Sequence, residues 1–169
     1  MTQSKTEDDR LNEQDLQTLL SQLSDPDKAV RAEAACGLAA IGKPAVSACI
    51  ALLQNSDWKV RYRAAEVLGQ IGDGEAYAAL TAALDDGKDH VRYMAAKGLG
   101  LLGDPRAVTH LGVMQRDENE FVRRSAASSL GRIGGCEAIG LLRTALRDEA
   151  AAGVRVAIVA ALRGNGAGV

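Results

Sequence analysis

Aromatic residues, cysteines and histidines are scarce in this chain of 169 residues. It holds one tryptophan, one phenylalanine, three tyrosines, three cysteines and two histidines. The cysteines show no paired spacing, so neither a disulfide framework nor a CxxC metal site is predicted. The histidines, His90 and His110, form no HExxH motif and no cluster of metal-ligand spacing. The sequence therefore predicts no catalytic residue, no metal site and no cofactor.

An excess of charge and long apolar runs are also missing. Twenty basic residues against twenty-two acidic residues give a formal net charge of −2. That balance disfavours nucleic-acid binding, which depends on concentrated lysine and arginine. No apolar run approaches the roughly 18 residues of a membrane-spanning helix, and the start, MTQSKTEDDR, lacks the apolar segment of a signal peptide. We therefore expect a cytoplasmic protein with no nucleic-acid or membrane partner.

What the chain does contain is a repeated unit. The segment VRYRAAEVLGQIG begins at Val60, and similar segments begin at Val30, Val91, Val122 and Val154. Successive valines lie 30, 31, 31 and 32 positions apart, and an arginine follows each one. Self-similarity at such a period predicts a solenoid, in which each unit buries its apolar face against its neighbours.

Each copy has the pattern of an amphipathic helix that ends in glycine. In the copy that begins at Val60, apolar residues recur three or four positions apart and so share one helix face. The closing glycines suit the left-handed residue just past a helix end; they are Gly42, Gly72, Gly103 and Gly134. Glycine also recurs inside the helix, at Gly69, Gly100 and Gly131. Because glycine is costly there, its recurrence predicts close approach between helices.

Another helix, which precedes the repeated segment, completes each unit, so five helix pairs are expected. The approximate repeats are 11–42, 43–72, 73–103, 104–134 and 135–164, forming a single domain over 11–164. The first helix is predicted over about 11–23, with a polar outer face suited to a terminal unit. Residues 1–10 and 165–169 are expected to be flexible tails.

A hydrogen-bond acceptor lies six residues before each repeated arginine. These acceptors are Asp25, Asn55, Asp86, Asp117 and Glu149, and the arginines are Arg31, Arg61, Arg92, Arg123 and Arg155. One interpretation is a structural ladder that ties each turn to a neighbouring helix. The alternative is a functional row of arginines that binds anions. We favour the ladder, because paired charges at repeated positions usually stabilise the fold.

The pattern L-x-D-x-D/N-x-x-V-R-x-x-A-A-x-x-L-G-x-I-G resembles HEAT-like repeats of the subclass named after phycobilisome (PBS) lyases. The resemblance covers about 11–164 and implies an all-α, right-handed α-solenoid of the armadillo/HEAT type, with the second helices on its concave side. It also implies a protein-interaction scaffold. The fifth copy departs from the pattern, because Ile158 and Val159 replace the alanine pair. The His-Glu iron ligands of a relative in this repeat class, deoxyhypusine hydroxylase, are absent from the motif positions.

Positions two, three and six after each valine are expected on the concave face. In the central repeats they bring together residue types that are enriched at protein interfaces: Tyr62, Arg63, Glu66, Tyr93, Met94, Lys97 and Arg124. Trp58, His90 and Phe121 precede these helices and are expected along one rim. The alternative is an ordinary solvated face with scattered aromatics; if the face is functional, its partner is a protein or peptide.

The C-terminal helix offers a second candidate surface. Its sequence, VRVAIVAAL, has almost no polar face, and Val156, Val159 and Ala160 are expected at an uncapped apolar edge. Such an edge favours a homodimer or a complex with another protein. Among the cysteines, Cys49 is expected in the core. The reactivity of Cys36 and Cys136 stays open.

The sequence thus favours a non-enzymatic adaptor or scaffold that binds a partner on its concave face. The alternative is a phycobilin lyase-like or chromophore-handling subunit, which the repeat subclass suggests by analogy alone.

Overall fold

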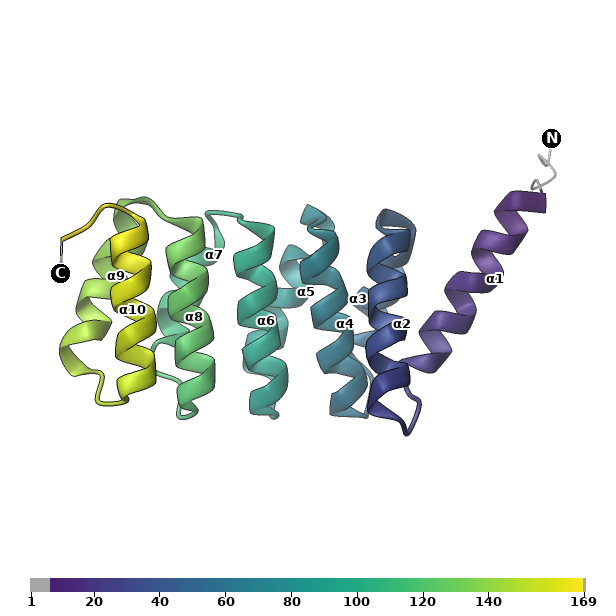
Figure 1. Cartoon of the computed structure of the whole chain (residues 1–169), viewed down its shortest axis with the longest axis horizontal. Coiled ribbons are helices and arrows are strands. Elements are labelled where there is room, and N and C mark those ends of the chain that lie inside the picture. The colour runs from purple at the N-terminus through teal and green to yellow at the C-terminus, as the bar shows by residue number, and fades with distance from the viewer. Residues whose placement is uncertain (1–6, 169) are drawn as a thin grey trace.

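A computed structural model describes residues 7–168, with side chains from residue 13 onward. Ten α-helices form five antiparallel pairs stacked along one axis, with both ends of the chain at opposite ends of the stack (Figure 1). The described residues contain no strand. The predicted all-α solenoid of five helix pairs is confirmed.

The first helices of the pairs are the more irregular set. They are α1 (Glu7–Gln22), α3 (Val46–Leu52), α5 (Tyr77–Ala82), α7 (Ala107–Met114) and α9 (Gly135–Asp148). Three short 3₁₀ helices flank them, η1 (Lys43–Ala45), η2 (Gly74–Ala76) and η3 (Ala83–Asp85). Helix α1 begins at Glu7, earlier than the expected residue 11, and it leans outward from the stack (Figure 1). Residues 1–6 of the expected tail lie outside the described residues.

The second helices are regular and nearly equal in length. They are α2 (Lys28–Ile41), α4 (Trp58–Ile71), α6 (Asp89–Leu102), α8 (Glu120–Ile133) and α10 (Ala152–Gly164). Side-chain oxygens of Asp27, Asp57 and Asn119 accept backbone N–H groups at the start of α2, α4 and α8, which satisfies donors that a helix start leaves free. The predicted glycines end α2, α4, α6 and α8, with φ between +70° and +75°.

Close packing of the second helices holds the stack together. A β-carbon added to Gly69 would lie 2.7 Å from the Cα of Gly98, and one added to Gly100 would lie 2.8 Å from the Cα of Ser129. The interior glycines therefore allow neighbouring backbones to touch, as predicted. One apolar core runs the length of the stack between the two helix layers, and its fully buried leucines include Leu38, Leu68 and Leu99.

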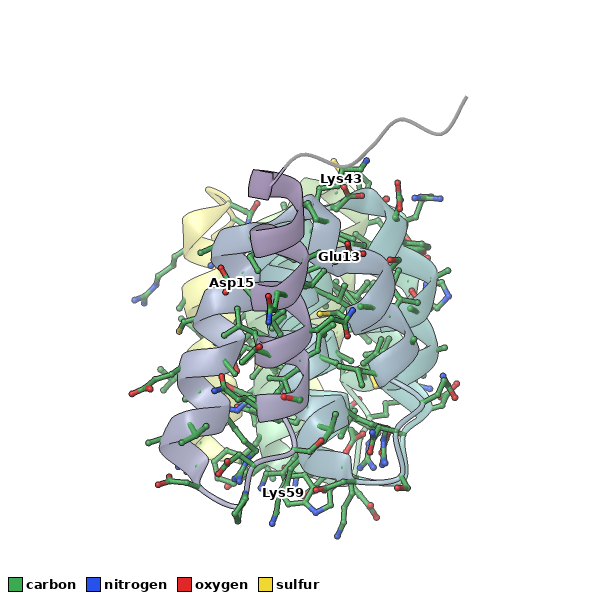
Figure 2. All side chains as sticks on the ribbon, turned by 90° about the vertical axis from the view of Figure 1, so that its right-hand side faces the viewer. Glu13, Asp15, Lys43 and Lys59 are labelled. Carbon is green, nitrogen blue, oxygen red and sulfur yellow. The ribbon has the colours of Figure 1, made fainter. Side chains whose placement is uncertain are left out.

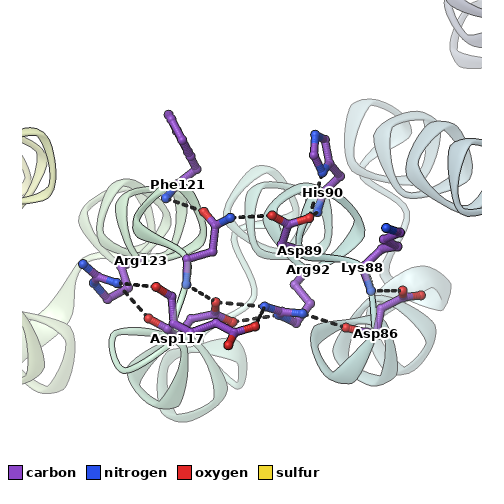
Figure 3. A network of polar contacts seen from close by, with 10 residues as sticks. Asp86, Lys88, Asp89, His90, Arg92, Asp117, Phe121 and Arg123 are labelled. Atoms are coloured by element: carbon purple, nitrogen blue, oxygen red, sulfur yellow. Dashed lines mark hydrogen bonds and ion pairs between the residues drawn. The ribbon is translucent and has the colours of Figure 1, made fainter.

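The predicted ladder is present and joins successive repeats (Figure 3). The Nε atoms of Arg61, Arg92 and Arg123 donate to carboxylates of the next repeat, Asp86, Asp117 and Glu149, at 2.6–2.7 Å. The Nη2 atom of each arginine donates to the second oxygen of the same carboxylate. The Nη1 atom donates to a backbone carbonyl six residues earlier in its own repeat. Each of these arginines thus fixes its own turn and the next one, in the two-pronged geometry that makes such pairs strong.

The first rung of the ladder lacks its carboxylate. Arg31 is only 9% exposed, and its hydrogen bonds run to the carbonyl oxygens of Asp25 and Pro26. The equivalent acceptor in the next repeat is Asn55, whose Oδ1 accepts the backbone N–H of Asp57 at 2.8 Å. The other side-chain atom of Asn55 is an amide nitrogen, which is a donor. Asn55 therefore cannot offer Arg31 the second acceptor oxygen that a carboxylate supplies in the other rungs.

We expect Asn55→Asp to stabilise the fold by about 1 kcal/mol, because it supplies the missing acceptor for a nearly buried arginine. Urea unfolding followed by circular dichroism measures the effect. Gln54→Glu is the matched control, because it adds the same charge at an exposed neighbouring position. An equal gain in the control would contradict the assignment of Asn55 to the ladder.

The ladder also predicts how stability depends on pH. Hydrogen bonds from Arg61 and Arg123 hold the pKa of Asp86 and of Glu149 below their ordinary values. This stabilisation is complete above the unfolded-state pKa of about 4 and is lost as pH falls through the lower folded-state values. We expect the unfolding free energy to decline below about pH 4, and to decline less in the Asp86→Asn/Glu149→Gln variant. Parallel pH profiles for the two proteins would contradict this role of the two carboxylates.

Candidate interaction groove on the second-helix face

The surface formed by α2, α4, α6, α8 and α10, here called the second-helix face, carries most of the predicted partner-binding residues. Neighbouring second helices contact one another more extensively than neighbouring first helices do. That difference is expected when the second helices form the inner side of a curved stack. The chemistry of this face depends on which side chains remain accessible between the close-packed helices.

Residues from three repeats surround one hollow of about 310 Å³ on this face. Its lining includes predicted residues from the face, Tyr62, Tyr93 and Arg124, and from the rim, His90 and Phe121. Phe121 is 51% exposed, and the guanidinium of Arg124 lies 5.1 Å from its ring centre. Exposed aromatic surface thus lies beside a cation here, as it also does on the first-helix face, where the guanidinium of Arg106 lies 4.2 Å from the ring centre of Tyr77.

The rim of this hollow is held by contacts between helix starts. The ring of Trp58 lies 5.0 Å from that of His90, and the His90 ring contacts Asp89 at 2.8 Å. Asn119 donates to the other oxygen of Asp89 and accepts the backbone N–H of Phe121 (Figure 3). These bonds link the starts of α6 and α8 and so hold the backbone that carries His90 and Phe121.

A second hollow of about 220 Å³ continues along α6 and α8 and shares Tyr93 and Arg124 with the first. Lys97, Leu101 and Arg132 also line it. The two hollows together are called the aromatic groove below. Leu101 and Arg132 were not predicted, although they lie ten positions after their valines and extend the row through positions two and six. Extending the row by a further four residues along each helix would have included them.

Three predicted residues, Met94, Arg63 and Glu66, are less accessible than expected. Met94 is only 2% exposed and belongs to the core, so it is not available to a partner. Arg63 pairs with Glu66 at 2.5 Å, and their side chains are 12% and 19% exposed. The reason is that position three faces the preceding repeat; at this position in α8, Ser125 donates to the backbone carbonyl of Tyr93. The expectation that positions two, three and six share one open face is therefore corrected at position three.

The charge of the aromatic groove is positive. Lys97 and Arg132 are exposed, as is Arg124, whereas the carboxylate in its lining, Asp89, is engaged with His90 and Asn119. The hydroxyl of Tyr62 is half-buried, and burial together with the nearby Glu66 carboxylate raises its pKa. The groove therefore offers phenol and phenyl rings and three cations to a bound partner.

The remaining candidate residues lie elsewhere. Val156 is 70% exposed at the C-terminal end, with Ala160 exposed and Val159 partly buried beside it. Cys49 is in the core, where burial raises its pKa to about 11, whereas Cys36 and Cys136 are exposed. Among the residues that the structure describes, no group of three or more His, Cys, Asp or Glu side chains is placed to hold a metal ion.

Within residues 7–168, no single helix is both long and apolar enough to cross a membrane. The segments Lys28–Ile41 and Lys43–Leu52 reach such a length and composition only when joined across a 119° bend.

Comparison with solved structures shows the same architecture in other proteins. The structure of the complex of CpcE and CpcF of phycocyanin lyase from Nostoc sp. PCC7120 contains a chain that is 24% identical, with a TM-score of 0.81 over 86% of this chain and 96% of that one. YibA of Escherichia coli is 22% identical, with a TM-score of 0.75 over 98% and 66% of the two chains. A computationally designed armadillo repeat protein for modular peptide recognition is 22% identical, with a TM-score of 0.56 over 88% and 81%.

A search of curated protein sequences finds no significant match. The sequence model that describes HEAT repeats matches residues 16–92 and 83–163, which together cover most of the chain. The predicted repeat family is confirmed: the chain belongs to the HEAT-repeat family.

Proposed function

We propose that this protein is a non-enzymatic interaction module that binds an extended segment of a partner protein in the aromatic groove. The observation that carries the proposal is the joining of two hollows across α4, α6 and α8, lined by accessible aromatic and cationic side chains. Aromatic residues and arginine dominate binding energy at protein interfaces. A groove between parallel helices also suits an extended chain better than a flat surface would.

The groove's charge defines the kind of segment that fits. Lys97, Arg124 and Arg132 attract carboxylates, and the rings of Tyr93 and Phe121 provide apolar contact area. We infer a partner segment that alternates acidic and apolar or aromatic residues. Complementary charge of this kind mainly sets specificity and the rate of association. Solved armadillo structures designed for modular peptide recognition share the fold, which supports this use of the surface.

Tyr93 is the aromatic side chain that lines both hollows, so its removal should be strongly damaging. We expect Tyr93→Ala to weaken binding of an acidic-aromatic peptide about tenfold or more, as for a central aromatic anchor. The probe is a peptide selected from a displayed random library, and fluorescence anisotropy measures its affinity. Tyr77→Ala is the matched control: Tyr77 is a partly buried tyrosine on first helix α5.

Equal affinity of wild type and Tyr93→Ala for the peptide would show that the binding site lies outside the groove. Loss of binding in Tyr77→Ala alone would place it on the first-helix face.

The charge preference makes a separate prediction. Reversing two exposed cations, in Lys97→Glu/Arg132→Glu, should change the selected peptides from acidic to basic, because like charges across an interface repel. Sequencing the selected libraries measures this shift. Unchanged enrichment of acidic peptides would show that the groove cations do not contact the partner.

The second candidate function is the handling of a bilin chromophore. The lining of the groove, with phenol and phenyl rings beside arginine and lysine, also suits a planar conjugated molecule that carries carboxylates. The likeness in fold to a chain of the phycocyanin lyase complex supports it at the level of architecture. Added bilin should then acquire a shifted absorbance that Tyr93→Ala removes. Peptide binding without any bilin absorbance favours the interaction module.

A further inference from the structure

The second hollow of the aromatic groove, of about 220 Å³, collects three cations. They are Lys97 on α6 and Arg124 and Arg132 on α8, and all three are exposed. None of the described residues that line this hollow is acidic, and none of the three cations forms an ion pair with a described residue. The arginines of the complete rungs, by contrast, each hold a carboxylate. The positive charge of the hollow is therefore available to a ligand.

The three cations are arranged around one exposed serine. Arg124, Ser128 and Arg132 follow one another at intervals of four residues along α8, so they share one helix face. Lys97 holds on α6 the place that Ser128 holds on α8, six residues after the valine of its repeat. Because α6 and α8 pack side by side (Figure 1), all four side chains line the same hollow. An anion bound above Ser128 thus meets cations from two helices.

The floor of this hollow is fixed by hydrogen bonds between the two helices. The hydroxyl of Ser125 donates to the carbonyl oxygen of Tyr93 at 3.0 Å, and that of Ser129 donates to the carbonyl oxygen of Ala96 at 2.8 Å. These bonds hold the backbones of α6 and α8 at a set separation. The cations of the two helices are therefore brought together before any ligand binds, which lowers the cost of ordering them around it.

Three cations in one hollow match a phosphate group better than a carboxylate. A carboxylate carries a single charge on two oxygens. A phosphate monoester carries a charge of about −1.5 to −2 at pH 7 and has three strong acceptor oxygens. Guanidinium groups bind phosphate oxygens in the same two-pronged geometry that they use with carboxylates. The composition of the hollow thus favours a phosphorylated group.

The rest of the groove favours a peptide over a nucleic acid as the carrier of that group. A nucleic acid has a phosphate at every nucleotide and is bound by basic residues that follow its backbone. Lys97 and Arg132 do not line the first hollow, which has the carboxylate of Asp89 and the rings of Tyr62 and Phe121 in its lining. The groove therefore combines one site for phosphate with an adjacent site for an apolar or aromatic side chain.

We propose that the second hollow binds a phosphoserine or phosphothreonine of the partner segment, while an apolar or aromatic residue of the same segment occupies the first hollow. The short side chain of either residue keeps the phosphate near the segment's backbone, so that its neighbours reach the adjacent hollow. Lys97, Arg124 and Arg132 contact the phosphate oxygens. This proposal rests on the proposed function of the aromatic groove, and it makes binding depend on phosphorylation of the partner.

Two matched peptide pools test the phosphate site. Both have the same random flanking positions, but one has phosphoserine at its centre and the other has glutamate. Fluorescence anisotropy measures the apparent Kd of each labelled pool. We expect wild type to bind the phosphoserine pool about tenfold more tightly than the glutamate pool, and Lys97→Gln/Arg132→Gln to bind the two pools equally. Arg147→Gln is the matched control, because it removes an exposed arginine from first helix α9, and it should keep the full preference.

Equal affinity of wild type for the two pools overturns the proposal, as does a preference that persists in Lys97→Gln/Arg132→Gln. If the glutamate pool binds and Tyr93→Ala weakens it, but phosphoserine adds nothing, the interaction module stands and the phosphate site falls. If neither pool binds, both fall. Circular dichroism checks the folding of each variant. Should the double variant be unfolded, Arg132→Gln alone is expected to reduce the preference, and an unchanged preference overturns the proposal.

Two other ligands distinguish the source of the phosphate. Inorganic phosphate and a labelled oligothymidylate should each bind wild type more weakly than the phosphoserine pool does, because neither supplies an apolar side chain for the first hollow. Inorganic phosphate that binds as tightly as the pool would identify a site for free phosphate. Tighter binding of the oligothymidylate, lost in Lys97→Gln/Arg132→Gln, would identify a nucleic-acid site. Either result overturns the assignment to a phosphorylated peptide.

Discussion

The fold depends on one recurring interaction, the arginine that joins two turns of successive repeats. In a solenoid the apolar core is drawn out along the stack, so each unit is stabilised only by its neighbours. Apolar packing between second helices supplies most of the buried area but is weakly directional. The bidentate pairs Arg61–Asp86, Arg92–Asp117 and Arg123–Glu149 fix the distance and rotation between units. They act at the turns, where helix packing alone would leave the register of the stack loosely defined.

The ladder and the helix pairs could be predicted from sequence because both repeat. A residue type that returns every 30 to 32 positions reports on equivalent environments, and five copies average out local exceptions. The same comparison located the interior glycines and the close contacts they permit, as at Gly69 and Gly100. Periodicity constrains the average repeat, however, and it says least where copies differ, as at Asn55.

The candidate site was only partly predictable for the same reason. Position three was assigned to the open face because it lies off the apolar stripe of its own helix. In a stack, a helix has two further buried flanks, one toward each neighbouring repeat, so a residue off the stripe, such as Met94, can still be buried. Which flank is covered depends on the angle between repeats, which sequence spacing does not contain. The joining of the two hollows through Tyr93 and Arg124 could not be predicted for the same reason, because it depends on how residues of different repeats are placed relative to one another.

Different parts of the stack carry residues with different roles. The turns carry the ladder, the interior carries the leucines and glycines, and the outer rows of the second helices are left free for aromatic and cationic residues. Side chains can therefore change in the groove without altering the spacing of repeats.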